Sequence, residues 1–324
     1  MLIPTFEDVL EDQKDLDSLC ADRELKTNEI FVGNAFYGND RIIKEFAGFS
    51  EKYSLKFIIP HGVVLSRKFV WDAEVNSKLS SVMCYQENRI DTYKRRMGSG
   101  KYVFRGAAPF AYIPQLIDNK KKFKRTGTIF FPAHSTHYLT VEMDYELLAE
   151  KLANLEEIYQ PVIVCLYWRD YNLGMSKIFE SKGLRVVSAG HIYDPQFLFR
   201  FYHLCSSREY SACNQIGTHA FYAQYAGCKH FSIDTGNIIM MGENEVIERD
   251  LNPDAAKDEK KYTDLFSSPI KDLEKKNDSL EATLSSSFKK TRLGLKALLL
   301  KTELIHFGYK ASNSRLVTKL RKLI

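Results

Sequence analysis

The 324-residue chain lacks the short motifs that identify many nucleotide-dependent and metal-dependent proteins. No strand-like run is followed by GxxxxGK[ST] or by GxGxxG, which argues against a Walker-type nucleotide hydrolase and a Rossmann dehydrogenase. An HExxH pair and a GxSxG nucleophile elbow are also missing. No pair of carboxylates of the DxD kind stands at a strand end. We therefore expect no metal ion and no bound cofactor.

Paired cysteines and long apolar runs are absent as well. The six cysteines are scattered without a CxxC pair, and several fall in apolar runs, which is typical of reduced core residues. No apolar run approaches the roughly 20 residues of a membrane span. The first residues are acidic and lack the charged-then-apolar order of a signal peptide. These features predict a cytoplasmic protein.

The net positive charge of the chain is confined to the C-terminal segment. The net charge is +5, yet the segment 288–324 alone holds ten Lys and Arg against one Glu. Apolar residues there recur at helical spacing: Leu293, Ala297, Leu300, Leu304, Phe307, and then Leu316, Leu320 and Leu323. A basic amphipathic helix can lie on an anionic membrane surface, or it can pack back on the body of the protein. Both readings stay open, whereas the lack of interleaved aromatics argues against nucleic-acid binding.

Strand-like apolar runs alternate with helical patterns through most of the chain. In the first half such runs cover 29–33, 55–62 and 80–85, and a fresh series begins at Thr128 after a basic connector. Continuous apolar strands between helices are typical of a parallel sheet covered on both faces. The predicted fold class is therefore α/β, with domains at 1–120 and 121–242 and a charged linker with basic helices at 243–324. One larger sheet is the alternative.

The stretch 209–234 organises the second half. It predicts a strand at 209–213, a tight loop at 214–217, a helix at 218–226 and a strand at 229–233. Ser211, Asn214, Gly217 and Thr218 then gather at a helix N-terminus, where backbone N–H groups and the helix dipole favour an anion such as phosphate. An ordinary turn with an N-capping Thr is the competing interpretation.

Further polar residues follow other predicted strands, where ligands bind in open α/β sheets. His61 and His134 stand at equivalent corners of the two halves, so we expect both to line one cleft. A histidine there can act as a general base or contact a phosphate, or it can simply be a hydrogen-bonded turn residue. The other candidates are Gly33, Asn34, Ser135 and Thr136 at strand ends, and Asp40 and Asp72 as reserve bases.

Two α/β halves facing a cleft resemble the GT-B class of glycosyltransferases. Pro60-His61-Gly62 is similar to the His-Gly corner of CDP-glycerol glycerophosphotransferases. The run 132–135 is similar to their Pro-His-Pro corner and to the His-Pro corner of bacterial sialyltransferases that use CMP-sialic acid. Ser135 replaces the proline, and 214–218 replaces a paired-serine turn. The resemblance implies two Rossmann-like domains in a metal-independent enzyme of capsule or lipopolysaccharide assembly.

Roles follow from this resemblance by position. His61, with Asp72 in reserve, would be the catalytic base, and the acceptor side would include Gly33, Asn34 and Asp40. The donor-binding residues would be His134, Ser135, Thr136, Ser211, Asn214, Gly217 and Thr218. The donor would be a nucleotide-activated sugar, CMP- or CDP-linked, and the acceptor a glycan or glycolipid, with peripheral contact to the inner membrane face through 288–324. The rival readings are a hydrolase or isomerase, and a non-catalytic nucleotide-sugar or polysaccharide-binding protein or inactive transferase partner.

Overall fold

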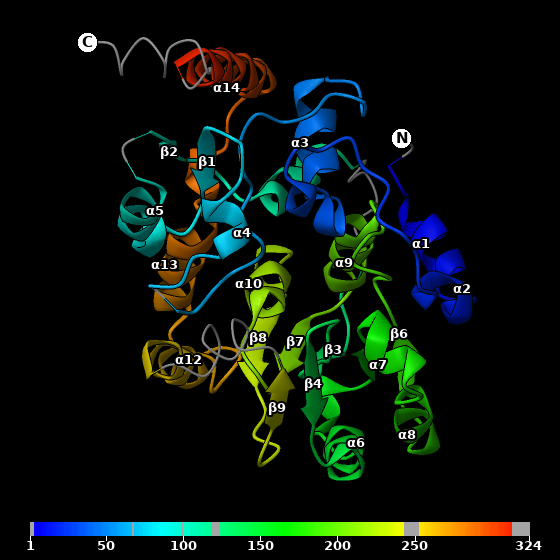
Figure 1. Cartoon of the computed structure of the whole chain (residues 1–324). Coiled ribbons are helices and arrows are strands. Elements are labelled where there is room, and N and C mark those ends of the chain that lie inside the picture. The colour runs from blue at the N-terminus through cyan, green and yellow to red at the C-terminus, as the bar shows by residue number, and fades with distance from the viewer. Residues whose placement is uncertain (1–2, 67, 99, 118–123, 243–252, 313–324) are drawn as a thin grey trace.

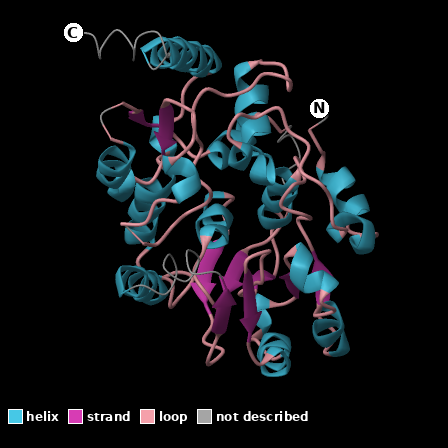
Figure 2. Cartoon of the chain, in the orientation of Figure 1, coloured by secondary structure: helices cyan, strands magenta, loops and turns pink. Residues whose placement is uncertain are grey.

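The computed structural model describes residues 3–66, 68–98, 100–117, 124–242 and 253–312. Its largest element is a parallel sheet of five strands in the order β6-β5-β3-β7-β8. The fold is therefore mixed α/β, as predicted (Figure 2). The strands are β3 (Thr128–Phe131), β5 (Val162–Cys165), β6 (Arg185–Val187), β7 (Tyr210–Cys213) and β8 (Lys229–Ser232).

Both faces of this sheet are covered, and its three central strands, β5, β3 and β7, are buried along their whole length. Phe130 belongs to one core cluster, whereas its neighbours Ile129 and Phe131 belong to the other, as the alternation of a strand requires. The connecting helices supply the covering layers (Figure 1). They are α6 (Tyr145–Ala153), α7 (Trp168–Asn172), α8 (Ser176–Ser181), α9 (Phe197–Ser206) and α10 (Thr218–Tyr225), with a 3₁₀ turn η4 (Glu157–Tyr159).

A small antiparallel pair extends from this half of the molecule. β4 (Leu139–Glu142) pairs with β9 (Ile239–Gly242) over a small apolar cluster. The sequence did not predict this pair, because its strands are short and one of them is largely exposed.

The N-terminal half has a much smaller sheet. β1 (Ser81–Cys84) and β2 (Tyr102–Arg105) are parallel, and a single bridge joins Ile58 to Val82. Helical segments make up most of the rest. They are α1 (Phe6–Asp12), α2 (Leu16–Cys20), η1 (Val32–Gly38), α3 (Asn39–Ala47), α4 (Asp72–Val75), η2 (Glu87–Arg89), α5 (Ile90–Met97) and η3 (Pro109–Gln115).

The strand predicted at 55–62 is wrong, since that run forms only the single bridge at Ile58. The strand predicted at 29–33 is also wrong, since that run leads into the 3₁₀ helix η1. The reason is a side chain that takes a strand's place. The Asn34 amide donates to the Phe57 carbonyl (2.9 Å), and its oxygen accepts from the Ile59 N–H (2.8 Å). The Asn34 side chain thus makes the hydrogen bonds to the Phe57 carbonyl and the Ile59 N–H that a neighbouring strand would otherwise have made.

The chain returns to the N-terminal half after the large sheet. α12 (Pro253–Leu265), α13 (Leu273–Leu284) and η5 (Ser286–Phe288) lead to α14 (Arg292–Ser312). The segment predicted as a charged linker therefore contains packed helices, with Phe266 and Leu284 fully buried. The predicted boundaries at 120 and 242 adjoin undescribed residues, and Leu316, Leu320 and Leu323 lie outside the described ones. Among the described helices none is long and apolar enough to cross a bilayer.

Candidate functional site

A pocket of about 250 Å³ lies at the carboxyl ends of the large sheet. Its floor is formed by residues that follow β3, β5, β6 and β7. The chain leaves β3 towards β5 and β6 on one side and later continues to β7 and β8 on the other, so the order reverses between β3 and β7. Open α/β sheets bind their ligands at this kind of reversal. The pocket therefore occupies the position where this architecture forms a binding site.

The loop after β3 places His134 on the pocket wall. Its neighbours on both sides are fixed through their backbone N–H groups. The Ala133 N–H donates to Asn214 Oδ1 (2.7 Å), and the Ser135 N–H donates to both oxygens of Asp170 (3.1 Å each). Two clamps on the flanking residues hold the backbone of His134 in one orientation.

Asp170 makes this clamp from a buried position. Its side chain is almost entirely inaccessible to solvent, and burial raises the pKa of the carboxyl from 3.8 to about 6, against the stabilising effect of the Ser135 amide. Most molecules are thus ionised at neutral pH, and the Ser135 N–H bond is then a charge-assisted one.

The loop after β7 leads into the N-terminus of α10. Gly217 is the N-cap residue, and no side chain caps the helix. Helix N-termini attract anions because their first N–H groups lack acceptors inside the helix. The first helical residue, Thr218, lines the pocket together with Gly217. These two residues give the pocket one wall suited to a phosphate oxygen.

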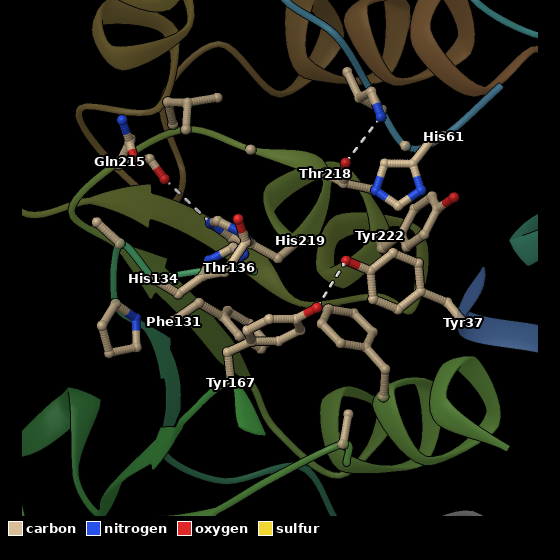
Figure 3. A pocket seen from close by; sticks show the side chains of 18 of the residues that line it. Tyr37, His61, Phe131, His134, Thr136, Tyr167, Gln215, Thr218, His219 and Tyr222 are labelled. Atoms are coloured by element: carbon tan, nitrogen blue, oxygen red, sulfur yellow. Dashed lines mark hydrogen bonds between the residues drawn. The ribbon is translucent and has the colours of Figure 1, made fainter. Parts of the chain in front are cut away.

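His219, the next residue, lies on the same side of the pocket as His134 (Figure 3). Its Nε2 is 3.1 Å from the Gln215 carbonyl, which can only accept, so Nε2 carries the ring proton. The ring stacks on Phe131 with centroids 5.3 Å apart. Burial lowers the pKa of His219 to about 3, so this imidazole stays neutral at pH 7.

The opposite wall comes from the N-terminal half. His61 lies between Phe36 and Tyr37, with ring centroids 5.4 and 5.3 Å away. The backbone beside it is held by the Tyr85 hydroxyl, which lies within donating distance of the carbonyls of Pro60 (3.0 Å) and Gly62 (2.7 Å). This wall therefore depends on side chains reaching across the N-terminal half.

Two contacts cross the pocket from wall to wall. The Val63 N–H donates to Thr218 Oγ1 (2.8 Å), and the hydroxyls of Tyr37 and Tyr167 lie 3.3 Å apart (Figure 3). Gly62 permits the first contact: its φ is +65°, and a Cβ there would stand 2.7 Å from Thr218 Oγ1. The Thr218 hydroxyl accepts from Val63 and can still donate its own hydrogen.

Five of the predicted site residues line the pocket, and seven do not. His61, His134, Thr136, Gly217 and Thr218 line it. Asn214 lies behind it as a backbone clamp, Ser135 is held there by Asp170, and the Ser211 hydroxyl faces Nδ1 of buried His230 (2.8 Å). The remaining four lie elsewhere: Gly33 and Asn34 in η1, Asp40 against Lys44 (2.7 Å), and Asp72 against Arg96 (3.0 Å).

Several lining residues escaped the sequence analysis. Tyr167 lies in the strand-like run 161–168, two residues after β5 ends, and His219 adjoins Thr218, so both stand next to positions that the sequence marks as strand or loop ends. Tyr37 has no such signal, because the strand predicted before it does not form. The structure gives it a left-handed φ of 58° and aims it at the pocket.

The charge of the pocket is unusual for a site that would hold phosphate. Among the lining residues that the structure describes, none is Lys or Arg, and the one carboxylate is Glu259. Positive potential can still come from imidazoles and from the N-terminus of α10. An anion in this pocket would therefore be held by hydrogen bonds more than by permanent cations.

One group of described side chains has the composition of a metal site. Asp22, His137 and His191 bring one potential ligand atom each to within 4.8 Å of the others. However, Nδ1 of His191 accepts from the Tyr193 N–H (3.1 Å), which leaves the ring proton on Nε2, facing Asp22 Oδ1 at 3.2 Å. A metal bound at Nε2 would force the ring proton onto Nδ1. That proton would then point at the Tyr193 N–H, which is itself a donor. The group is better explained as a hydrogen-bonded pair with a nearby histidine.

Comparisons with known proteins identify no family. No protein-family model and no curated protein matches the chain. One solved structure with partial likeness is a mutant of S. aureus TarM in complex with fondaparinux, alpha-GlcNAc-glycerol and UDP. Its sequence is 14% identical to this chain, and the TM-score is 0.36. The match covers 82% of this chain and 52% of the TarM chain. This chain thus spans about half the length of that protein. The S. aureus MnaA–UDP structure is 10% identical to this chain, with a TM-score of 0.40. That match covers 84% of this chain and 79% of the MnaA chain. Likenesses this partial do not establish a shared activity.

Proposed function

We propose that this chain is a metal-independent glycosyltransferase of the GT-B type, which moves a sugar from a nucleotide-activated donor to a cell-envelope glycan. The observation that carries the proposal is the position of the pocket. It lies at the strand-order reversal between β3 and β7, with His134 and the α10 N-terminus on one wall and His61 on the other. The resemblance of the two His corners to envelope transferases points the same way.

The donor side would be residues 121–242. A nucleotide-linked sugar would place its phosphate between His134 and Thr218, where the α10 N-terminus and the two side chains can donate to its oxygens. When the bond between the anomeric carbon and the phosphate oxygen breaks, its electron pair stays on that oxygen. Donors fixed around that oxygen stabilise the developing charge, and this is the main contribution that a metal-free site can make.

The acceptor side would be residues 1–120. His61 would take the proton of the acceptor hydroxyl as that oxygen forms its bond to the anomeric carbon. Asp72 is not part of this proposal, since its carboxylate pairs with Arg96 and does not line the pocket. The base role therefore rests on His61.

A non-catalytic nucleotide-sugar-binding protein is the second candidate. The contacts Val63–Thr218 and Tyr37–Tyr167 already join the two walls, and 250 Å³ is below the 300–1,000 Å³ of ordinary ligand pockets. Either protein would have to open to admit its ligand, but a binding protein would admit only the nucleotide-sugar, whereas a transferase would also admit the acceptor.

Two measurements test the proposal and separate the candidates. Isothermal titration with CMP, CDP, UDP and GDP should show binding of at least one nucleotide. Incubation with the corresponding nucleotide-sugars and a panel of envelope glycans should then release that nucleotide. Binding without release would favour the binding protein, and no binding at all would refute both.

A further inference from the structure

Helix α14 presents an apolar face to solvent. Leu293, Leu300, Leu304 and Phe307 are 77, 47, 74 and 75% exposed. We call these four residues the outer face of α14. The other side of the helix packs on the body of the protein through Leu295, Leu299, Thr302 and His306. In Figure 1, α14 lies at the edge of the molecule, next to the N-terminal half.

The outer face is a continuous stripe. Its residues stand at i, i+7, i+11 and i+14, which places them on one side of a helix. Elsewhere, exposed apolar side chains such as Ile158 and Leu173 stand on short separate elements, and scattered residues of that kind are ordinary. A contiguous exposed stripe indicates an interaction surface.

The charges beside this stripe decide between possible occupants. The exposed cations of α14 are Arg292, Lys296, Lys301 and Lys310, and Glu303 is the only acidic residue in the helix. A second copy packing symmetrically on the same face would bring two basic rims together, which is unfavourable. An anionic surface with an apolar interior matches both the rim and the stripe.

We propose that α14 docks the protein on an anionic lipid bilayer, with the helix lying in the plane of the interface. The outer face would enter the boundary between headgroups and acyl chains, and the cations would contact the headgroups. The ammonium groups of Lys296 and Lys301 lie 5.9 and 5.3 Å from the ring centroids of Phe49 and Tyr102. These contacts place the two cations at the flanks of α14, against the body of the protein. The proposal does not depend on the chemistry of the pocket.

Vesicle sedimentation with the full-length chain tests the proposal. We expect binding to vesicles of phosphatidylcholine with phosphatidylglycerol, and little binding to phosphatidylcholine alone. The double variant Leu304→Glu/Phe307→Glu should lose about 100-fold in partitioning, at about tenfold or more per buried apolar side chain. Lys296→Gln/Lys301→Gln should lose about fivefold per lysine, equivalent to about 1 kcal/mol each.

A matched control separates the outer face from exposed apolar surface in general. Ile158→Glu/Leu173→Glu changes two residues that are 62 and 54% exposed on other elements, and it should bind vesicles like the wild type. Circular dichroism melting checks that every variant folds. The proposal is overturned if the wild type does not bind anionic vesicles, or if Leu304→Glu/Phe307→Glu binds them normally. It is also overturned if light scattering shows a lipid-independent dimer that only this variant dissociates.

Discussion

The two walls of the pocket are built by different means. The wall that carries His134 and Thr218 belongs to the loops of a five-stranded sheet, and local clamps from Asn214 and Asp170 hold it. In the wall that carries His61, the preceding segment pairs with β1 through one bridge only. Hydrogen bonds from the Tyr85 hydroxyl hold the backbone on both sides of His61. A wall tied to a large sheet can hold a ligand in fixed geometry, and a wall tied by a few long-range contacts can move against it. In the proposed transferase, the His134 wall would hold the donor in place, and the His61 wall would move towards it with the acceptor.

The largest expected effect separates the chemical roles of the walls. His61→Ala should lower the rate of sugar transfer by about 10²–10⁴, because a general base contributes that much. Nucleotide affinity should stay within about twofold, since the nucleotide would bind to the other wall. Transfer rates and titration calorimetry on the same preparation check this. Full activity of the variant would remove His61 as the base.

Asp170 tests how the His134 wall is held. Its folded-state pKa of about 6 lies above its unfolded value of 3.8, so the folded protein binds that proton more tightly. Stability should therefore fall as pH rises from about 4 to 6, by roughly 3 kcal/mol from this group at 1.36 kcal/mol per pKa unit. Asp170→Asn should remove that part of the pH dependence. Urea unfolding at both ends of the window, compared between wild type and variant, measures it, and identical slopes would show that Asp170 is not the titrating group.

Gly62 tests the contact between the walls. Gly62→Ala should cost about 1–2 kcal/mol of stability for its left-handed backbone and more for the clash with Thr218. Gly174 is a matched control, because its φ is +83° and a Cβ there meets nothing within 4 Å. Gly174→Ala should show the backbone cost alone. Equal losses of stability for the two variants in thermal unfolding would mean that the clash with Thr218 adds nothing, so that the walls can move apart at that point without cost.

The smallest expected effect is that of chelation. We expect EDTA to leave nucleotide affinity and transfer rate unchanged, because the sequence has no paired carboxylates at a strand end. Restoration of lost activity by Mg²⁺ or Mn²⁺ would contradict this. His137→Ala should likewise leave both quantities unchanged, because His137 does not line the pocket.

The same difference between the walls explains what the sequence could predict. The stretch 209–234 was predicted closely: β7, α10 and β8 each lie within one residue of their predicted bounds. Local signals sufficed there, because each strand is an apolar run and the turn contains its own glycine. The N-terminal half could not be predicted as well, since Asn34 replaces a strand by pairing with residues 57 and 59, far away in the sequence. No local sequence pattern indicates that a side chain will take the place of a strand.

The candidate site shows the same limit. His61 and His134 were predicted to share a cleft from their strand-end positions, and the structure places both on one pocket. The strand-end rule could not tell residues behind the wall from residues that face the pocket. Asn214 clamps the wall from behind and Ser135 is held there by Asp170, whereas Thr136 faces the pocket. That distinction depends on the direction of each side chain, which is set by partners such as Asp170 that are distant in sequence.

The most direct test of the account is calorimetric titration of CMP, CDP, UDP and GDP into the wild type, His134→Ala and the control His137→Ala. A charge-assisted contact is worth about 1.5–3 kcal/mol, so His134→Ala should weaken the nucleotide that binds best by about 10–150-fold. His137→Ala should bind that nucleotide like the wild type. Failure of every nucleotide to bind, or equal affinity in His134→Ala and wild type, would contradict a phosphate site between His134 and the N-terminus of α10.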